Sequence, residues 1–512
     1  MEGYEALGAV VVTSDADASA QSAARTAEPR GYDPRRIVRN LQAAAVGEAV
    51  VRGTSFLATI IVARTLSASD FGRFSFVVAV VSVGILISDV GLQVASTRAI
   101  AIDRARAAAY VTSVLILGGV CALLSYTVIV GSGLLGLLPF GVTKAAAIFG
   151  LVLFLAVGTN AWGSHLRGFE RQDLIYVALA VSAIVLLGGV VFVARGGPSV
   201  ETLLTVWVVS FALRVVLILV FLAARVQHPR WHLDRGVLRA TAVAAPAVAA
   251  AYILQGAYSH LDVVLLGFLV TAKNVGEYAA AYRLVDGVTF VTAGAATAAV
   301  FPVFARLAKE HPAEVPRLYG VVSRFMTAAL APLALLLVAL AQPLVELVFG
   351  RDNDETVRLF ALLAPSTLLI ALNFTAAFVA LAIGRTREAI ICTGAAAAVN
   401  VAANLVGVPL IGTEAATVAT LLAEVVMLAL FQVTLARRLT GANVARAAAV
   451  AVALASTAVA AVAVAGDARV AVGLIGAVVA LPLLAVTRSF DPGDADRLRR
   501  VVAVAMSLRR RP

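Results

Sequence analysis

Long apolar segments follow one another along most of this chain, from about residue 41 to residue 487. Each is about as long as an α-helix that crosses a bilayer core of ~30 Å, which takes ~20 apolar residues. Only short polar connectors separate them. The pattern predicts an all-α integral membrane protein with about fourteen spanning helices, at approximately 41–63, 74–97, 108–130, 145–165, 174–194, 203–224, 241–270, 279–305, 319–349, 357–383, 389–411, 415–436, 447–466 and 470–487.

The composition excludes a soluble protein. Hydrophobic residues make up 61% of the chain and charged residues 14%, whereas soluble domains have about 45–50% apolar and ~25% charged residues. The net charge of +11 does not indicate a nucleic-acid partner, because the basic residues are spread over many connectors instead of forming one stripe. Cys121 and Cys392 both lie in apolar segments, which predicts reduced thiols and no disulfide framework.

The distribution of Lys and Arg predicts an orientation. With the N-terminus in the cytoplasm, 17 of these residues lie at the inner connectors and 8 at or next to the outer ones. Inner connectors of membrane proteins carry the excess of Lys and Arg. We therefore expect an even number of helices, cytoplasmic N- and C-termini, and a place in the plasma (inner) membrane.

Two segments with the same local pattern indicate an internal repeat. Residues 66–76 read LSASDFGRFSF and residues 270–280 read VTAKNVGEYAA, which places Gly72 over Gly276. Each segment has a polar cap, a glycine, and an aromatic residue that opens the next helix. This local pattern indicates equivalent turns in two halves of the chain.

A second pair of segments follows the fourth and tenth predicted helices. RGFERQDLI begins at Arg167 and IGRTREAII at Ile383, with Gly168 over Gly384. Two halves with six helices each point the same way and form parallel repeats, with the substrate path between them. The expected organisation is a disordered tail, an N-terminal six-helix bundle, a C-terminal six-helix bundle, two extra helices and a basic cytoplasmic tail, at 1–36, 37–226, 227–440, 441–490 and 491–512.

Several of these segments resemble a known family. The sequence of residues 63–101, the segment 258–284 and the connector 167–174 are similar to Wzx-type polysaccharide-biosynthesis flippases, in the MOP superfamily that also contains MATE drug exporters and the lipid II flippase. The resemblance implies a flippase that moves a polyprenyl-pyrophosphate-linked oligosaccharide between leaflets for cell-surface polysaccharide synthesis. It also implies glycan polymerase or glycosyltransferase partners.

Charged residues lie inside the predicted helices as well. A charge at the centre of a membrane helix costs ~2.5–3.5 kcal/mol, so such residues usually face the bundle interior or water. Glu48 and Arg52 are four positions apart, and Arg283 and Asp286 three apart, so each pair can meet on one helix face. Each pair either lines a substrate path or holds helices together.

The arginines among these residues suit the proposed cargo. A pyrophosphate is doubly anionic, and Arg presents a rigid fork of donors that matches phosphate oxygens. Arg52, Arg214 and Arg283, with Glu48 and Asp286 beside them, are therefore the candidate cavity residues.

A second set of residues is a candidate for ion coupling. The chain has no GxxxxGK[ST] nucleotide-binding run, which predicts that it does not hydrolyse ATP. Asp262, His260 and Glu424 are instead candidates for H⁺ or Na⁺ coupling, because a carboxyl group in a low-dielectric site can hold a proton near neutral pH.

Three other functions compete with this interpretation. A MATE-like cation-coupled drug antiporter would favour the carboxylates Asp262 and Glu48, and a lipid II flippase would share the fourteen helices. A membrane enzyme would usually have a large outer loop with catalytic residues, and the longest predicted outer connector has about a dozen residues. We expect no enzyme activity, no catalytic residues, no cofactor and no metal centre.

Overall fold

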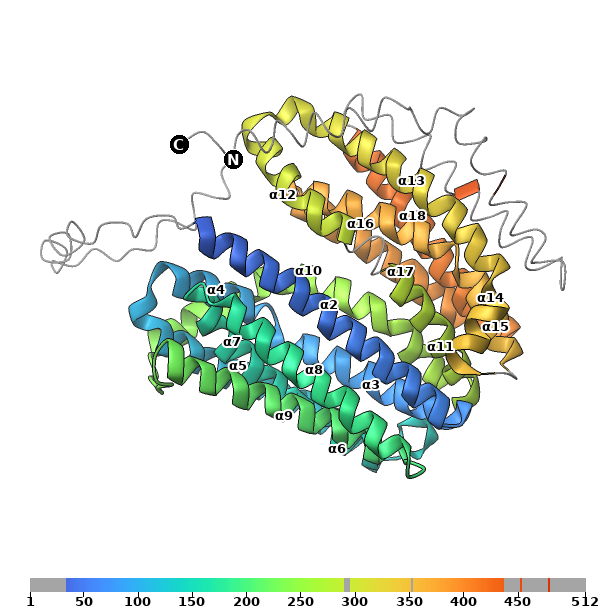
Figure 1. Ribbon diagram of the computed structural model, residues 1–512, viewed down its shortest axis with the longest axis horizontal. Helices are drawn as coiled ribbons and strands as arrows, with labels where there is room; N and C mark the ends of the chain where they lie inside the picture. The colour runs from blue at the N-terminus through green and yellow to red at the C-terminus, as the bar shows by residue number, and fades with distance from the viewer. Residues whose placement is uncertain (1–33, 290–294, 351–352, 437–451, 454–477, 479–512) are drawn as a thin grey trace, which may run out of the picture.

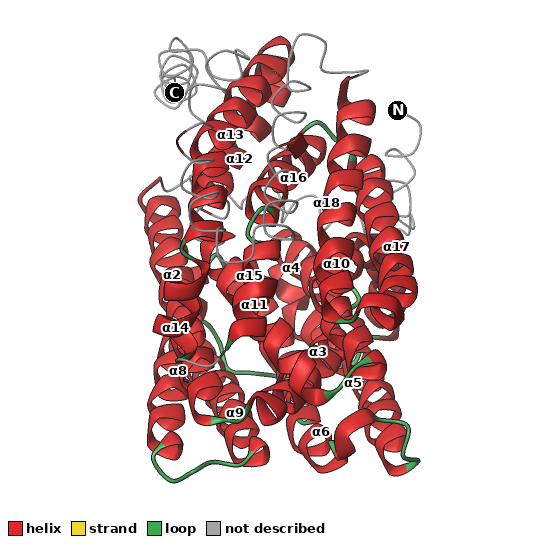
Figure 2. Cartoon of the chain, turned by 90° about the vertical axis from the view of Figure 1, so that its right-hand side faces the viewer, coloured by secondary structure: helices red, strands yellow, loops and turns green. Residues whose placement is uncertain are grey.

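The protein is described here by a computed structural model, in which residues 34–289, 295–350, 353–436, 452–453 and 478 are defined. These residues form helices and connectors and contain no strand (Figures 1 and 2). The predicted all-α class is thereby confirmed. The first group of helices, with the 3-10 turns η2 (Arg104–Arg106) and η3 (Pro139–Gly141), comprises α2 (Pro34–Thr65), α3 (Ala68–Asp89), α4 (Leu92–Ile102), α5 (Ala107–Leu134), α6 (Thr143–Gly150), α7 (Val152–Gly168), α8 (Gln172–Ala194) and α9 (Val200–Arg225).

The second group of helices follows a connector that ends at Asp234, whose carboxylate caps the start of the next helix. With the 3-10 turn η5 (Pro312–Glu314), it comprises α10 (Arg235–Leu269), α11 (Ala272–Thr289), α12 (Ala295–Glu310), α13 (Val315–Ala339), α14 (Ala341–Phe349), α15 (Asp354–Leu363), α16 (Ser366–Ala382), α17 (Thr386–Ile411) and α18 (Thr413–Ala436).

Each of the first twelve predicted segments corresponds to one helix or to two consecutive helices. Ten stretches of the described chain are long and apolar enough to cross a membrane. The segment predicted at 74–97 is broken at Val90 and Gly91, whose φ angles of 39° and 73° are left-handed. The predicted helices 447–466 and 470–487 and both tails lie almost wholly outside the described residues, so the count of fourteen stays a prediction.

The two groups repeat the same packing arrangement. In the first group α2 packs on α8, α8 on α9, and α7 on α9. In the second group the corresponding pairs are α10 with α17, α17 with α18, and α16 with α18. The order of helices along the chain is the same in both, as expected for parallel repeats. The bundle boundaries at residues 226 and 440 remain predictions.

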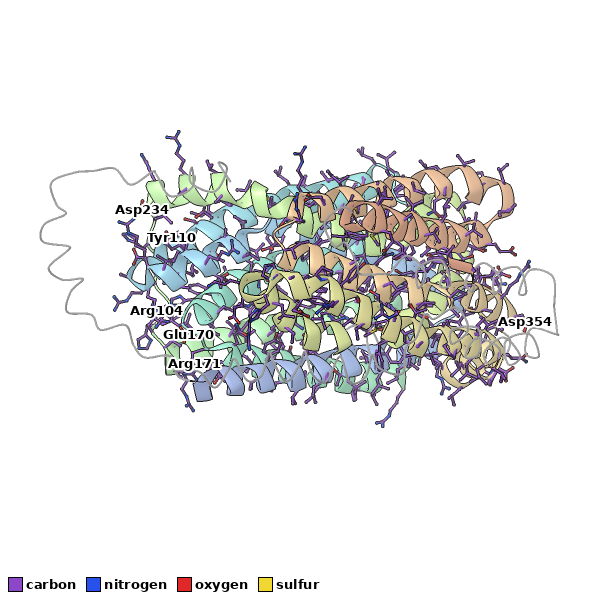
Figure 3. All side chains as sticks on the ribbon, turned by 90° about the horizontal axis from the view of Figure 1, so that it is seen from above. Arg104, Tyr110, Glu170, Arg171, Asp234 and Asp354 are labelled. Carbon is purple, nitrogen blue, oxygen red and sulfur yellow. The ribbon has the colours of Figure 1, made fainter. Side chains whose placement is uncertain are left out.

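The long axis of the molecule has two chemically distinct ends. Figure 3 shows Arg104, Glu170, Arg171 and Asp234 together at one end, the Arg104 end, and Asp354 at the opposite one, the Asp354 end. One apolar cluster contains residues of both groups, from α2, α3 and α6 in the first and from α11, α14 and α15 in the second. Two further clusters hold residues mainly of one group each. The groups therefore share an apolar core toward the Asp354 end, while toward the Arg104 end each group has a core largely of its own (Figure 1).

Helices α3 and α11 cross at the two glycines that the sequence repeat pairs. A Cβ atom added at Gly72 would lie 1.7 Å from the carbonyl oxygen of Ala272, and one added at Gly276 would lie 2.0 Å from that of Ala68. The contacts are reciprocal, because Ala68 and Ala272 are themselves equivalent in the repeat. Only glycine allows the two backbones to approach this closely.

The capping of both helices is equivalent too. The Ser67 hydroxyl accepts a hydrogen bond from the Asp70 amide at 3.1 Å, and the Thr271 hydroxyl accepts one from the Asn274 amide at 3.4 Å. Both hydroxyls satisfy an amide that has no partner within its own helix. The first predicted repeat is thus present in the structure.

A further contact joins the groups at the Asp354 end. Arg64, at the end of α2, donates from Nε to the Val348 carbonyl at 2.7 Å and from Nη2 to the Leu347 carbonyl. These carbonyls end α14, where the helix dipole favours a positive charge. The Arg64 side chain therefore ties the first group to the second.

The second predicted repeat is real, but its register was wrong. Glu170 and Gly384 have φ angles of 60° and 76°, and the amides of Arg171 and Arg385 donate to Leu166 and Ala380. This 6→1 bond after a left-handed residue ends both helices in the same way. Glu170, and not Gly168, is therefore the equivalent of Gly384. A glutamate in a position that usually takes glycine concealed the alignment.

The crossing of α3 and α11 predicts the effect of two substitutions. Gly72→Ala and Gly276→Ala should each lower the stability of the purified protein by about 1–3 kcal/mol, because the added methyl group meets a backbone carbonyl that has no room to move. The midpoint of thermal unfolding in detergent measures this. Gly119→Ala and Gly188→Ala are the controls, since these helical glycines have no atom within 4 Å of an added Cβ. Equal melting temperatures in all four variants would contradict the proposed close packing.

Candidate functional site

Two oppositely charged pairs lie on helices that belong to different groups. Arg52 Nε is 2.6 Å from Glu48 Oε1 on α2, and Arg283 Nη1 is 3.7 Å from Asp286 Oδ2 on α11. The side chains of Arg52 and Glu48 are 55% and 40% exposed, and those of Arg283 and Asp286 are 40% and 50% exposed. We call these four residues the inter-bundle charges. Their net charge is zero.

The two pairs lie near each other across the boundary between the groups. Arg52 is close enough to Asp286 to interact with it electrostatically. One residue further along α11, a Cβ atom added at Gly287 would be 2.9 Å from the Phe56 ring of α2. The exposed charges therefore lie where the two groups face each other, which spares them the cost of facing hydrocarbon.

Arg214 occupies a different place from the one predicted for it. Its Nε donates to the Ser182 hydroxyl at 3.2 Å, and its guanidinium lies 4.3 Å from the centre of the Phe211 ring. Both contacts hold Arg214 between α8 and α9, within the first group. The structure thus brings together Arg52 and Arg283 but not Arg214.

A buried carboxylate marks a second site, within the second group. Asp262 on α10 is 6% exposed. The Tyr278 hydroxyl donates to its Oδ2 at 2.9 Å, the Thr420 hydroxyl lies 2.9 Å from the same oxygen, and Asn404 Nδ2 donates to Oδ1 at 3.1 Å. These groups come from α11, α18 and α17. We call Asp262, Tyr278, Asn400, Asn404 and Thr420 the Asp262 site.

The partners of Asp262 are hydroxyl and amide groups. In the described part of the chain no Lys or Arg forms an ion pair with it, and Asn404 Oδ1 is buried without a hydrogen-bond partner. The Ala416 carbonyl lies 2.9 Å from the Thr420 hydroxyl. One carboxylate among neutral oxygen atoms suits a hard cation, which binds oxygen ligands. In the same residues no group of three His, Cys, Asp or Glu could hold a metal ion.

The other two predicted coupling residues have different surroundings. Glu424, one turn beyond Thr420 on α18, is buried, and its Oε2 accepts a hydrogen bond from Asn373 Nδ2 at 2.7 Å. His260 lies within electrostatic range of Arg283, and among the described residues no hydrogen bond joins it to Asp262. Of the three residues predicted for ion coupling, Asp262 and Glu424 therefore lie within the second group, whereas His260 lies nearer to the inter-bundle charges.

Sequence reasoning missed Tyr278, Asn404 and Thr420. A signal for two of them was present, because Asn400 and Asn404 are four apart, as are Thr420 and Glu424. Polar residues with that spacing share one face of a helix.

Comparisons with known proteins agree with this architecture. The model of the family described as polysaccharide biosynthesis protein matches residues 37–308. No curated protein sequence matches the chain. Among solved structures, the lipid II flippase MurJ in an inward closed conformation is similar at 9% identity with a TM-score of 0.67, over 86% of this chain and 98% of that one.

Two conformations of a multidrug resistance MATE family transporter of the MOP superfamily are similar as well. The inward-facing one has 15% identity and a TM-score of 0.64, over 78% of this chain and 98% of that one. The outward-facing one has 16% identity and a TM-score of 0.54, over 81% and 97%. At these identities the likeness concerns the fold. Since the family model covers more than half of its 512 residues, the chain belongs to the polysaccharide biosynthesis protein family, and it is a multi-pass membrane protein with the fold shared by MurJ and MATE transporters.

Proposed function

We propose that this protein is a flippase that moves a polyprenyl-pyrophosphate-linked oligosaccharide from the inner to the outer leaflet of the plasma membrane. The observation that carries the proposal is the pair Arg52 and Arg283, two half-exposed arginines on facing helices of the two groups. Membership of the polysaccharide biosynthesis family and the fold shared with a lipid II flippase support the same cargo class.

The arrangement of the inter-bundle charges suits an exchange of partners. Without cargo, each arginine is neutralised by an acid on its own helix, so neither charge is left bare at the depth of the membrane. A pyrophosphate offers stronger, bidentate acceptors to the same guanidinium groups. The cargo can therefore replace the two carboxylates, which turn toward water.

The packing of the two groups supports alternating access around this place. In the described chain, the large apolar cluster that both groups build lies toward the Asp354 end, and the fold is more similar to the inward-facing MATE transporter than to the outward-facing one. With the predicted cytoplasmic termini, the Arg104 end faces the leaflet in which the lipid-linked oligosaccharide is made. We infer that the described conformation is the one that receives cargo.

We propose that binding of a cation at the Asp262 site couples transport to an ion gradient. An ionised carboxylate in a buried site attracts a cation, and the neutral oxygens around it suit Na⁺. The same site can carry a proton, which is the alternative. In either case the ion gradient, and not ATP, would drive the change between the two conformations.

The first prediction concerns the arginines. Arg52→Ala and Arg283→Ala should each reduce export of surface polysaccharide at least about tenfold, because each removes a charged partner of the pyrophosphate. A strain without the chain, complemented with each variant at matched protein level, provides the measurement. Arg317→Ala is the control, since Arg317 is 75% exposed and pairs with Glu314.

Two outcomes would redirect this proposal. Unchanged export in both arginine variants would remove the inter-bundle charges from the cargo path. Unchanged glycans in the deletion strain, together with altered sensitivity to cationic drugs, would instead favour a MATE-like antiporter that uses Asp262 and Glu48. Accumulation of lipid II in place of another lipid-linked glycan would identify the lipid II flippase.

The second prediction concerns the ion. Asp262→Asn should abolish the stimulation of transport by an inward Na⁺ gradient in proteoliposomes, because it removes the only negative charge of the site. Asp354→Asn, an exposed acid at the far end of the second group, should leave the stimulation intact. Wild-type transport that responds to a pH gradient and not to Na⁺ would assign the site to a proton, and transport that responds to neither would exclude coupling.

A further inference from the structure

Helix α11 passes through three places that have separate roles. Near its start it carries Gly276, which crosses α3 of the other group. Two residues later it carries Tyr278 of the Asp262 site, and the helix goes on to Arg283 and Asp286 among the inter-bundle charges. Figure 1 shows α11 in the right-hand part of the molecule, and α11 packs beside α3 and α15 (Figures 1 and 2).

Tyr278 is the contact between this helix and the Asp262 site. Its side chain is 0% exposed. Its hydroxyl donates to Asp262 Oδ2 at 2.9 Å and lies 3.3 Å from the Thr420 hydroxyl. The other hydrogen-bond partners of Asp262 in the described chain come from α17 and α18, which do not carry cargo residues. Among these described partners, only Tyr278 lies on α11, the helix that carries the proposed cargo residues Arg283 and Asp286.

The geometry of α11 allows a displacement of Tyr278 to move both the crossing at Gly276 and the inter-bundle charge Arg283. Gly276 lies two residues before it and Arg283 five after it, which is ~7.5 Å along a helix. The ring of Tyr278 stacks on that of Tyr282, with centroids 6.0 Å apart, and Tyr282 directly precedes Arg283. A regular helix with packed aromatic rings moves as a unit and does not absorb the displacement locally.

We propose that Tyr278 is the positioning residue that couples a cation at Asp262 to the placement of α11, and through α11 to the crossing at Gly276 and to the inter-bundle charges. The inference rests on the proposed function, in that it takes the Asp262 site to bind Na⁺. It goes beyond that function because it names how the ion site and the cargo site communicate.

The physical cause is the competition for the oxygens of one carboxylate. Without the cation, the Tyr278 hydroxyl points its hydrogen at Asp262 Oδ2. A cation bound to that carboxylate repels the hydroxyl hydrogen and attracts the hydroxyl oxygen, so the preferred position of Tyr278 changes. Because coupling is reciprocal, cargo at Arg283 changes the affinity for Na⁺ by the same factor as Na⁺ changes the affinity for cargo.

The experiment measures Na⁺ binding and the movement of the bundles separately. Spin labels are attached at Leu137→Cys and Asp354→Cys, two exposed positions on different groups, after the native thiols Cys121 and Cys392 are replaced by alanine. In the full chain in lipid nanodiscs, Na⁺ should shift the distance distribution between the labels. The Na⁺-dependent rise in melting temperature gives the affinity, with K⁺ at equal ionic strength as the reference.

Two variants are expected to behave in opposite ways. Tyr278→Phe should keep the half-saturating Na⁺ concentration within about threefold of wild type, because the other ligands remain, and should lose the Na⁺-dependent shift in distance. Thr420→Val should raise the half-saturating concentration at least about tenfold and keep the full shift at saturating Na⁺. Tyr319→Phe is the matched control: Tyr319 is also buried in the second group, and its hydroxyl accepts from Gln432 at 3.3 Å. It should change neither quantity.

Each other result overturns the inference. A wild-type shift retained in Tyr278→Phe would show that α11 is coupled without the hydroxyl, and a large loss of Na⁺ affinity in that variant would make Tyr278 an ion ligand only. A wild type that binds Na⁺ but does not shift would refute the coupling and leave the ion site standing. A wild type that binds no Na⁺ would remove the sodium site of the proposed function, and this inference with it. Should Tyr278→Phe fail to fold, loss of the shift in Thr420→Val at saturating Na⁺ would still contradict the proposal.

Discussion

The cost of a charge in hydrocarbon is the constraint on which the rest of this structure depends. Each charged side chain described within the membrane-spanning helices must be paired, hydrogen-bonded or turned toward a polar space. Glu48 and Arg283 meet this requirement through opposite charges on their own helices. Arg214 meets it through a hydroxyl and an aromatic ring. Asp262 does so through hydroxyl and amide donors.

These solutions lead to two different kinds of site. The inter-bundle charges are neutral as a set and half exposed, so they can exchange partners with an anionic group at little electrostatic cost. Asp262 is buried and has only neutral partners in the described chain, so its negative charge favours a cation. We propose that one fold offers an anion site between the groups and a cation site within the second group. Helix α11 contributes residues to both.

The internal repeat explains how the two groups are held together. Equivalent turns place Gly72 and Gly276 against each other, and the reciprocal contact makes the crossing of α3 and α11 nearly symmetric. The sites themselves do not follow the repeat. In the first group, Asp89 accepts hydrogen bonds from the Asn160 side-chain amide and the Gln93 backbone amide, and among the described residues no hydroxyl donates to it. The scaffold is duplicated, whereas the chemistry belongs to particular helices.

The sequence by itself determined the first twelve apolar segments and the crossing glycines, because apolar period and turn chemistry are local properties. It also identified Asp262 and the pairs on α2 and α11. Only the tertiary structure decided which charges meet. Arg214 was grouped with Arg52 and Arg283, and its helix instead turns it toward Ser182. Asn404 and Thr420 lie 142 and 158 positions from Asp262, and the rotation and packing of whole helices, which no local pattern encodes, bring them to it.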